Sequence, residues 1–364
     1  MGSTHASIRT MTLKRSGWKI ALSIAIGLGI LIGVLSFVGW RETFAQMVGL
    51  GLLGILSVLG NVLMSMTFWI LCWWVILRSY GIQIPFRSII GARFAGYAVS
   101  YLTPTLYFGG EPVRAMLVLG KSEAPTTRIV ATIVVERFLG GLSMIVFILM
   151  GSFYALSSQQ IPAPERRLLA FAIGFVTFWI LVGLINFAGN FKWISRSIRL
   201  LGRLVQRWRK ALDRAAAKVS ETEDEVYNAF TKHWKGTLVA FLLQTVATFF
   251  VYTRPQFFFW FSSGTLSGTL FTFPQLSLIF AFTIMLSFFL WITPGGLGTA
   301  EAALVAVFAL VIPAATSAGV VAYSLTFKLA ESIFVAMGMI YLTKRGIQYM
   351  RTRAVEKPPE LNDK

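Results

Sequence analysis

The chain is dominated by long, uninterrupted runs of apolar residues that are separated by short polar segments. A run of about 20 apolar residues is long enough to cross the ~30 Å hydrocarbon core of a bilayer as an α-helix. The runs are continuous rather than alternating, which disfavours the strands of a closed barrel. Eight runs predict eight membrane-spanning helices, over residues 18–39, 48–77, 126–156, 168–189, 236–261, 274–292, 299–312 and 318–343.

The composition agrees with this pattern. Hydrophobic residues make up 56% of the 364 residues and charged residues 13%, and the mean hydropathy is +0.70. These values lie far outside the range of a soluble domain of this length. We therefore predict an all-α polytopic membrane protein with one transmembrane domain over residues 18–345, between an N-terminal tail (1–17) and a polar C-terminal tail (346–364).

The formal net charge of +18 is concentrated in three places outside the apolar runs. Basic residues precede the first run, follow the last one, and fill the central loop, where residues 192–218 contain nine Lys and Arg and the single acid Asp213. Because short basic segments stay on the cytoplasmic side, the charge indicates topology rather than nucleic-acid binding. It predicts a multi-pass protein of the cell (inner or plasma) membrane, with an uncleaved first span and with both termini and the central loop in the cytoplasm.

The positions of the cysteine and the histidines disfavour a disulfide, a metal site or a histidine-based catalytic site. The single cysteine, Cys72, lies inside the second predicted span, and the two histidines, His5 and His233, lie outside all spans. No disulfide, metal centre or histidine-based catalytic site is therefore expected. The sequence has no P-loop pattern, so no nucleotide cofactor is expected either.

The central loop has the periodicity of an amphipathic helix over about residues 195–219. Apolar residues recur at steps of three and four, and Arg and Lys follow the same rhythm on a neighbouring stripe. A basic face beside an apolar face that includes Trp208 fits the anionic surface of the cytoplasmic leaflet. The pattern also fits a surface helix without a specific ligand. The acidic residues between positions 221 and 225 are expected to be its solvated continuation.

Two short stretches interrupt the apolar sequence in matching ways: TPTLYFGGE at 103–111 and TPGGLGTAE at 293–301. In each, a Thr-Pro pair follows an earlier proline by 19 or 20 residues, and a glutamate follows seven residues later. Broken membrane helices occur where the backbone is buried in protein or lines a cavity. We predict two broken or re-entrant elements, 86–111 and 274–301, which form an inverted repeat and meet near the bilayer centre.

Eight charged residues fall within or beside the predicted spans, where an unpaired charge costs at least ~2.5 kcal/mol. They must pair or face a wet cavity. Arg254 is near the end of its span and is expected to extend to the membrane interface. The other charges fit a polar path for a substrate, and they also fit structural ion pairs such as Lys328 with Glu331. The eight residues are Glu111, Arg114, Glu136, Arg137, Arg254, Glu301, Lys328 and Glu331.

The glycines of the second break predict an anion site. Gly295, Gly296 and Gly298 permit positive φ and leave backbone N–H groups uncovered. A helix that begins near Thr299 would direct its positive end into the break. In the first break Arg114 follows two glycines and is able to bind two phosphate oxygens at once. Small residues also serve tight helix packing, and the sequence leaves that alternative open.

Three motifs, GGEPVR at 109–114, VVER at 134–137 and TPGGLGTAE at 293–301, together resemble the flippase-like integral membrane family named for the transmembrane region of lysylphosphatidylglycerol synthase. The similarity covers about residues 15–345. It implies a role in moving lipids with anionic or polyprenyl-linked head groups between leaflets, or in envelope-lipid modification. One departure is Gly140, where many members have an Asp. The positions that match the family's motif residues are Glu111, Arg114, Glu136, Arg137, Gly295, Gly296, Gly298 and Glu301.

We therefore expect translocation of an anionic or polyprenyl-linked lipid rather than catalysis. Two alternatives remain: an integral-membrane transferase that acts on a lipid phosphate with Glu111 or Glu301 as general base, and a non-catalytic subunit that assists envelope-lipid biosynthetic enzymes. The sequence contains no soluble aminoacyl-transferase domain like that of the synthases, so aminoacyl transfer by this chain alone is not expected. The expected substrate-binding residues are Glu111, Arg114, Glu136, Arg137, Gly295, Gly296, Gly298, Thr299, Glu301, Lys328 and Glu331.

Overall fold

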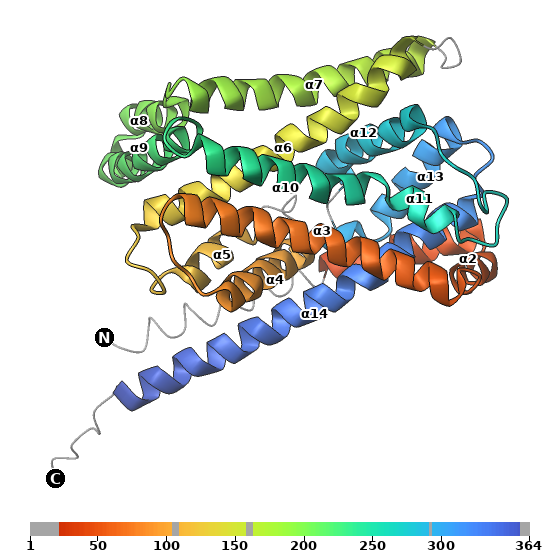
Figure 1. Cartoon of the computed structure of the whole chain (residues 1–364), viewed down its shortest axis with the longest axis horizontal. Coiled ribbons are helices and arrows are strands. Elements are labelled where there is room, and N and C mark those ends of the chain that lie inside the picture. The colour runs from red at the N-terminus through yellow and green to blue at the C-terminus, as the bar shows by residue number, and fades with distance from the viewer. Residues whose placement is uncertain (1–21, 104–108, 158–162, 291–292, 357–364) are drawn as a thin grey trace.

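The computed structural model describes residues 22–103, 109–157, 163–290 and 293–356, and all regular structure in these ranges is helical. A first helical stretch, Leu22–Val38, precedes the labelled helices of Figure 1. These helices are α2 (Trp40–Val48), α3 (Gly51–Ser79), α4 (Phe86–Leu102), α5 (Glu111–Val118), α6 (Thr126–Ser157), α7 (Ala163–Ala188), α8 (Trp193–Leu204), α9 (Arg209–Thr231), α10 (Trp234–Tyr252), α11 (Arg254–Phe259), α12 (Phe273–Leu290), α13 (Thr299–Val311) and α14 (Ser317–Glu356).

Four of the described helices are long and apolar enough to cross a membrane: α3, the Thr126–Met150 part of α6, α10, and the Ser317–Arg345 part of α14. A fifth crossing results if Leu22–Val38 and α2, which meet at 89°, are counted as one bent span. Shorter apolar helices accompany them, including a stretch of α7 at Ile173–Phe187. The prediction of an all-α polytopic membrane protein is confirmed.

The sixth and seventh predicted spans differ from expectation, because α12 and α13 form one hairpin. The 13 residues of α13 extend only ~20 Å at ~1.5 Å per residue, which is less than the hydrocarbon thickness. The two helices pack against each other, and a short 3₁₀ turn, η2 (Pro294–Gly296), lies in the break between them. Among the described residues, α13 is therefore too short to cross the membrane by itself.

A second hairpin is formed by α4 and α5, which also pack against each other. In Figure 1, α4 starts from the end of the bundle where α8 and α9 lie, whereas α12 starts from the opposite end. The end of α4 meets the second break inside the bundle, where the ring of Tyr101 lies directly against Gly295. The two predicted broken elements are thus present, and they enter from opposite ends.

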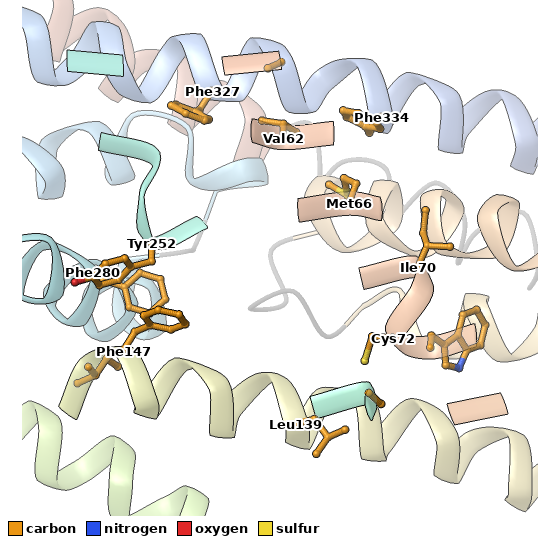
Figure 2. Packing of buried hydrophobic residues seen from close by; sticks show 14 of the residues in the cluster. Val62, Met66, Ile70, Cys72, Leu139, Phe147, Tyr252, Phe280, Phe327 and Phe334 are labelled. Carbon is orange, nitrogen blue, oxygen red and sulfur yellow. The ribbon is translucent and has the colours of Figure 1, made fainter. Parts of the chain in front are cut away.

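The core lies between these hairpins and the long helices. Figure 2 shows Phe147 of α6, Tyr252 of α10 and Phe280 of α12 in one aromatic group. Ring centroids lie 4.9 Å apart for Phe147 and Tyr252, and 5.7 Å apart for Tyr252 and Phe280. The Tyr252 hydroxyl donates to the Phe273 carbonyl at 2.9 Å, so its polar end is satisfied within the apolar core. This packing fixes α12 against α6 and α10.

The predicted amphipathic helix over residues 195–219 is instead a helical hairpin. α8 ends at Leu204, a short 3₁₀ turn follows, and α9 begins at Arg209 and packs back on α8. Gly202 is buried where the two helices meet, and a Cβ on it would lie at the ordinary van der Waals distance of 3.4 Å from the Leu212 side chain. The apolar residues of α8 remain exposed on its outer side, with Leu204 75% exposed.

The acidic residues of α9 are not simply a solvated continuation, because they hold neighbouring segments. Glu223 is buried and accepts from the backbone N–H of Ile194 at 3.1 Å, so it caps the start of α8. Lys192 donates to Asp224 at 2.7 Å. Partial burial of Asp224 opposes its ionisation, but hydrogen bonds from Lys192 and Asn190 outweigh this and lower its pKa. Glu225 pairs with Arg128 of α6 at 3.1 Å.

The end of α14 and the α8–α9 hairpin lie at the same end of the bundle, and the loop between α11 and α12 lies at the other (Figure 1). We expect Lys210→Cys and a cysteine at position 355 to react with an impermeant thiol reagent from the cytoplasmic side only. Ser267→Cys should react only from the opposite side. Native Cys72 is fully buried and contributes little background. Reaction of positions 210 and 267 from one side would contradict this topology.

Candidate functional site

The first group of charges, here called the arginine cluster, comprises Arg93, Glu111, Arg114, Glu136 and Arg137. At its centre Glu136 of α6 accepts hydrogen bonds from Arg93 of α4 on one oxygen and from Arg114 of α5 on the other. Glu136 is 3% exposed and Arg114 1%. Charges this deeply buried are stable only when paired and hydrogen-bonded. This triad therefore fastens the first hairpin to α6.

Two glycines let the first hairpin close so tightly. Gly96 of α4 is covered by the Arg114 side chain, and a Cβ there would lie 2.3 Å from the Arg114 Cγ. A Cβ on Gly110 would lie 1.9 Å from the Gly96 carbonyl oxygen. The Gly110 N–H donates to Ser100 Oγ at 2.9 Å, so the turn into α5 keeps its hydrogen bond. The glycines before Arg114 thus provide close contact between backbones.

Two tryptophans of α3 complete the surroundings of the arginines. The guanidinium carbon of Arg114 lies 4.2 Å from the ring centroid of Trp73, and that of Arg93 lies 5.4 Å from Trp69. Such cation–π contacts stabilise desolvated cations by about 2 kcal/mol or more. Arg93 and both tryptophans are not among the site residues that the sequence predicts. The signal for Arg93 was a lone cation among small and apolar residues in the middle of a broken element.

Arg137 does not pair with Glu136, its neighbour in sequence. It pairs with Glu111 at the start of α5, because successive residues of α6 point in different directions. The Arg137 side chain is 37% exposed and that of Glu111 18%, so this pair forms the open side of the cluster. With three arginines and two glutamates, the arginine cluster has a formal charge of +1.

The second group, here called the hairpin cluster, comprises Arg254, Glu301, Lys328 and Glu331. Glu301 is fully buried and has three donors. One carboxylate oxygen accepts from Lys328 Nζ at 2.6 Å and from Ser324 Oγ at 2.8 Å. The other accepts from the Gly298 N–H at 2.7 Å. The positive end of α13 is therefore capped by its own Glu301, where the sequence had suggested an open phosphate site.

The remaining two members pair in a way the sequence did not predict. Arg254 is not an interface residue, since its side chain is 13% exposed and pairs with Glu331 at 2.8 Å. Lys328, in turn, bonds to Glu301 and to the Gly296 carbonyl at 3.1 Å, rather than to Glu331 on its own helix. All the predicted charges are thus paired, as the structural alternative required, although with other partners.

The glycines of the second break adopt the positive φ that the sequence suggested. Gly295, Gly296 and Gly298 have φ of 60°, 63° and 79°. The open faces of Gly295 and Gly298 are filled by protein: Tyr101 covers Gly295, and a Cβ on Gly298 would lie 2.6 Å from the Gly27 carbonyl oxygen. Close packing of two backbones therefore accounts for Gly298. Thr299 begins α13, and its hydroxyl lies 3.3 Å from the Gly296 carbonyl oxygen.

A cavity of about 130 Å³ lies beside the second break, between α11, α12, α13 and α14. Its polar walls come from the hairpin cluster and from hydroxyl groups. The polar lining residues include Arg254, Thr283, Ser287, Ser324, Lys328 and Glu331. Within the described part of the chain, no three His, Cys, Asp or Glu residues stand close enough together to hold a metal ion.

Comparison with known proteins decides the family. The profile of the lysylphosphatidylglycerol synthase transmembrane region matches residues 20–337. The chain belongs to this family. The match includes both hairpins, both charge clusters and α6, so the resemblance inferred from three short motifs holds for nearly the whole transmembrane domain.

The chain is also similar to two archaeal proteins. A UPF0104 membrane protein of Methanocaldococcus jannaschii is 23% identical over 314 residues, which is 83% of this chain and 88% of the relative. A UPF0104 membrane protein of Pyrococcus horikoshii is 26% identical over 140 residues, which is 38% of this chain and 42% of that relative. No solved structure matches the chain.

Gly140 of α6 lies against α10. A Cβ at this position would be 3.3 Å from Gln244 Nε2. The Gln244 side-chain carbonyl is buried and has no hydrogen-bond partner in the described structure.

Proposed function

We propose that this protein moves a lipid with an anionic or polyprenyl-linked head group between the leaflets of the membrane. The observation that supports this most is the arginine cluster, which places a formal charge of +1 at the base of a re-entrant hairpin. A net cation inside a membrane protein is costly unless an anion completes it. A lipid phosphate supplies that anion while its tails stay in the bilayer.

The exposed pair Arg137–Glu111 is the point of entry in this proposal. Arg137 is the most accessible cation of the cluster, and a phosphate oxygen exchanges with Glu111 for it. Arg93 and Arg114 stay bound to Glu136 and contribute a positive potential behind the entering head group. The two hairpins enter from opposite ends, so a head group passed between their breaks crosses from one side to the other. Movement is driven either by the difference in lipid concentration between the leaflets or by coupling to proton transfer.

The α8–α9 hairpin serves as a membrane-surface contact in the same proposal. Exposed Leu200, Leu201 and Leu204 lie on the outer side of α8, and four arginines lie between positions 196 and 207. Apolar residues beside several cations favour the surface of an anionic leaflet, with about 1 kcal/mol for each cation near that surface. This contact raises the local supply of anionic lipid on the cytoplasmic side.

A leaflet-exchange assay in reconstituted vesicles tests the proposal, with a panel of labelled anionic, polyprenyl-linked and neutral lipids. The double substitution Arg137→Gln with Glu111→Gln removes one ion pair without leaving either partner charged. Hydrogen bonds to charged groups contribute about 1.5–3 kcal/mol, so we expect exchange of the anionic lipid to slow by about 10- to 100-fold. The thermal unfolding midpoint should stay within a few degrees.

Three results would oppose the proposal. Exchange at the parental rate in the double variant would remove the head-group role of this pair. A lipid panel without any exchange would favour the accessory-subunit alternative. Recovery of chemically altered lipid from the vesicles would favour the transferase alternative. Arg128→Gln with Glu225→Gln, which removes a pair outside the arginine cluster, is the matched control and should exchange lipid normally.

A further inference from the structure

The pair formed by Arg254 and Glu331 is the least satisfied ion pair of the hairpin cluster. Arg254 Nη1 binds Glu331 Oε1 at 2.8 Å. Its Nε and Nη2 are closed off from solvent and have no hydrogen-bond partner among the described residues. These two nitrogens lie on the same edge of the guanidinium group, the edge that binds both oxygens of a carboxylate or phosphate. One face of the group is covered by the Phe327 ring, whose centroid is 5.1 Å away.

The neighbouring Glu301 shows what a completed site looks like in this protein. Its carboxylate has three donors from a lysine, a serine and a backbone N–H, all within 2.8 Å. Buried donors of a charged group destabilise the protein when they are left without acceptors. Arg254 has two such donors. Arg254 is therefore a buried cation with room for a second hydrogen-bond acceptor on its free edge.

The cavity beside Arg254 has room for that acceptor. Its volume of about 130 Å³ is several times the ~15 Å³ that a single water requires by the same measure. Thr283 also lines this cavity, and its hydroxyl has no hydrogen-bond partner in the described structure. Other threonines in the helices, such as Thr248 and Thr326, donate to the carbonyl four residues earlier. The Thr283 hydroxyl is thus a second buried donor beside the cavity that has no acceptor among the described residues.

We propose that this cavity binds an oxyanion, a phosphate or carboxylate group, and that the oxyanion replaces the Glu331 carboxylate on Arg254. Glu331 and Lys328 are one helical turn apart on α14, so the displaced carboxylate has a second cation within reach. Lys328 lines the same cavity. The inference deepens the proposed function, and it rests on that function in one respect, the lipid origin of the oxyanion.

We expect the Glu331→Gln variant to bind the oxyanion more tightly than the unaltered protein does. Removing a carboxylate that competes for Arg254 should tighten oxyanion binding by about tenfold, the equivalent of one charge-assisted contact. The double substitution Arg254→Gln with Glu331→Gln should abolish binding. Glu225→Gln removes a carboxylate from the distant pair with Arg128 and should leave the affinity unchanged. A purely structural pair predicts no gain for Glu331→Gln.

Binding is measured with the full-length protein in neutral detergent micelles, from the dependence of the thermal unfolding midpoint on ligand concentration. The probes are phosphatidylglycerol, its head-group analogue glycerol phosphate, inorganic phosphate, and diacylglycerol as the uncharged lipid. A lipid head-group site is supported if only phosphatidylglycerol raises the unfolding midpoint, and if its affinity is highest for Glu331→Gln, lower for the unaltered protein and absent in the double variant. The same order of variants with glycerol phosphate or phosphate supports a site for a soluble oxyanion.

Unchanged or weaker binding by Glu331→Gln overturns the inference, and so does binding that persists in the double variant. These failures are distinguishable from failure of the proposed function. If the unaltered protein exchanges lipid but the variants show no affinity pattern, the cavity is not an oxyanion site and translocation stands. If the affinity pattern appears and no lipid is exchanged, the site stands and translocation fails.

Discussion

Replacing Glu136 by glutamine is expected to lower the free energy of unfolding by about 3–5 kcal/mol, the cost of breaking a buried ion pair by removing one partner. Two arginines lose their counterion at once, because Glu136 is bound by Arg93 and Arg114 through separate oxygens. Neither side chain has an exit to water, as Arg93 is 5% and Arg114 1% exposed. The cation–π contacts with the tryptophans of α3 remain but do not neutralise the charge.

The measurement is the thermal unfolding midpoint of the purified protein in detergent, with Glu225→Gln as the matched control. Glu225 also pairs with an arginine, but the Arg128 side chain is 42% exposed. Exposed pairs contribute about 0–1 kcal/mol, so this control should shift the midpoint little. Triple replacement of Glu136, Arg93 and Arg114 by Gln, Met and Met should recover much of the loss. Equal shifts for Glu136→Gln and Glu225→Gln would show that the triad does not fasten the hairpin.

Replacing Gly110 by alanine is expected to open the first hairpin. The new methyl group would lie 1.9 Å from the Gly96 carbonyl oxygen and 2.6 Å from Ser100 Oγ. The carbonyl belongs to the backbone of α4, so relief requires α4 and α5 to separate. Overpacking of this kind costs about 1–3 kcal/mol or more, and separation also pulls Arg114 away from Glu136. We expect loss of both stability and lipid exchange.

Gly60→Ala is the control for this prediction. Gly60 lies within α3, and a Cβ there has no neighbour within 4 Å. Alanine is favoured over glycine in a helix by about 1 kcal/mol, so Gly60→Ala should leave the protein unchanged or slightly more stable. Both variants are compared by thermal unfolding and by exchange rate in vesicles. A Gly110→Ala protein that exchanges lipid at the parental rate would show that the tight turn is dispensable.

The overall architecture could be predicted from the sequence because each signal is local. An apolar run long enough to span a bilayer becomes a helix whatever its neighbours are. Thr-Pro followed by glycines ends a helix and allows a turn, which fits α4 ending at Leu102 and α5 beginning at Glu111, and α13 beginning at Thr299 after the glycines of the second break. The matched spacing of the two breaks then indicated that they are counterparts. Helix length was less predictable, as the short α13 shows.

The partners of the charges could not be predicted, because they depend on how the helices pack. Lys328 and Glu331 have suitable spacing on one helix, yet each bonds to a residue on another element. Arg254 looked like a residue at a membrane boundary because its burial comes from α14, which is distant in sequence. Glu301 was expected to meet a ligand, and it caps its own helix instead. The local periodicity of the sequence does not indicate which residue each charged side chain pairs with.

The contact between Gly27 and Gly298 also sets an order of events during synthesis. The first helix packs its backbone against a turn that leaves the ribosome about 270 residues later. At roughly 5–20 residues per second, this turn is made about 15–50 s after the helix. Throughout that interval the N-terminal helix lies in the membrane without this partner, whereas Arg137, the last residue of the arginine cluster, is synthesised well before the interval ends. The second half of the protein must therefore close onto an early-built first half, and a translational pause within α12 would prolong a state with only one of the two hairpins.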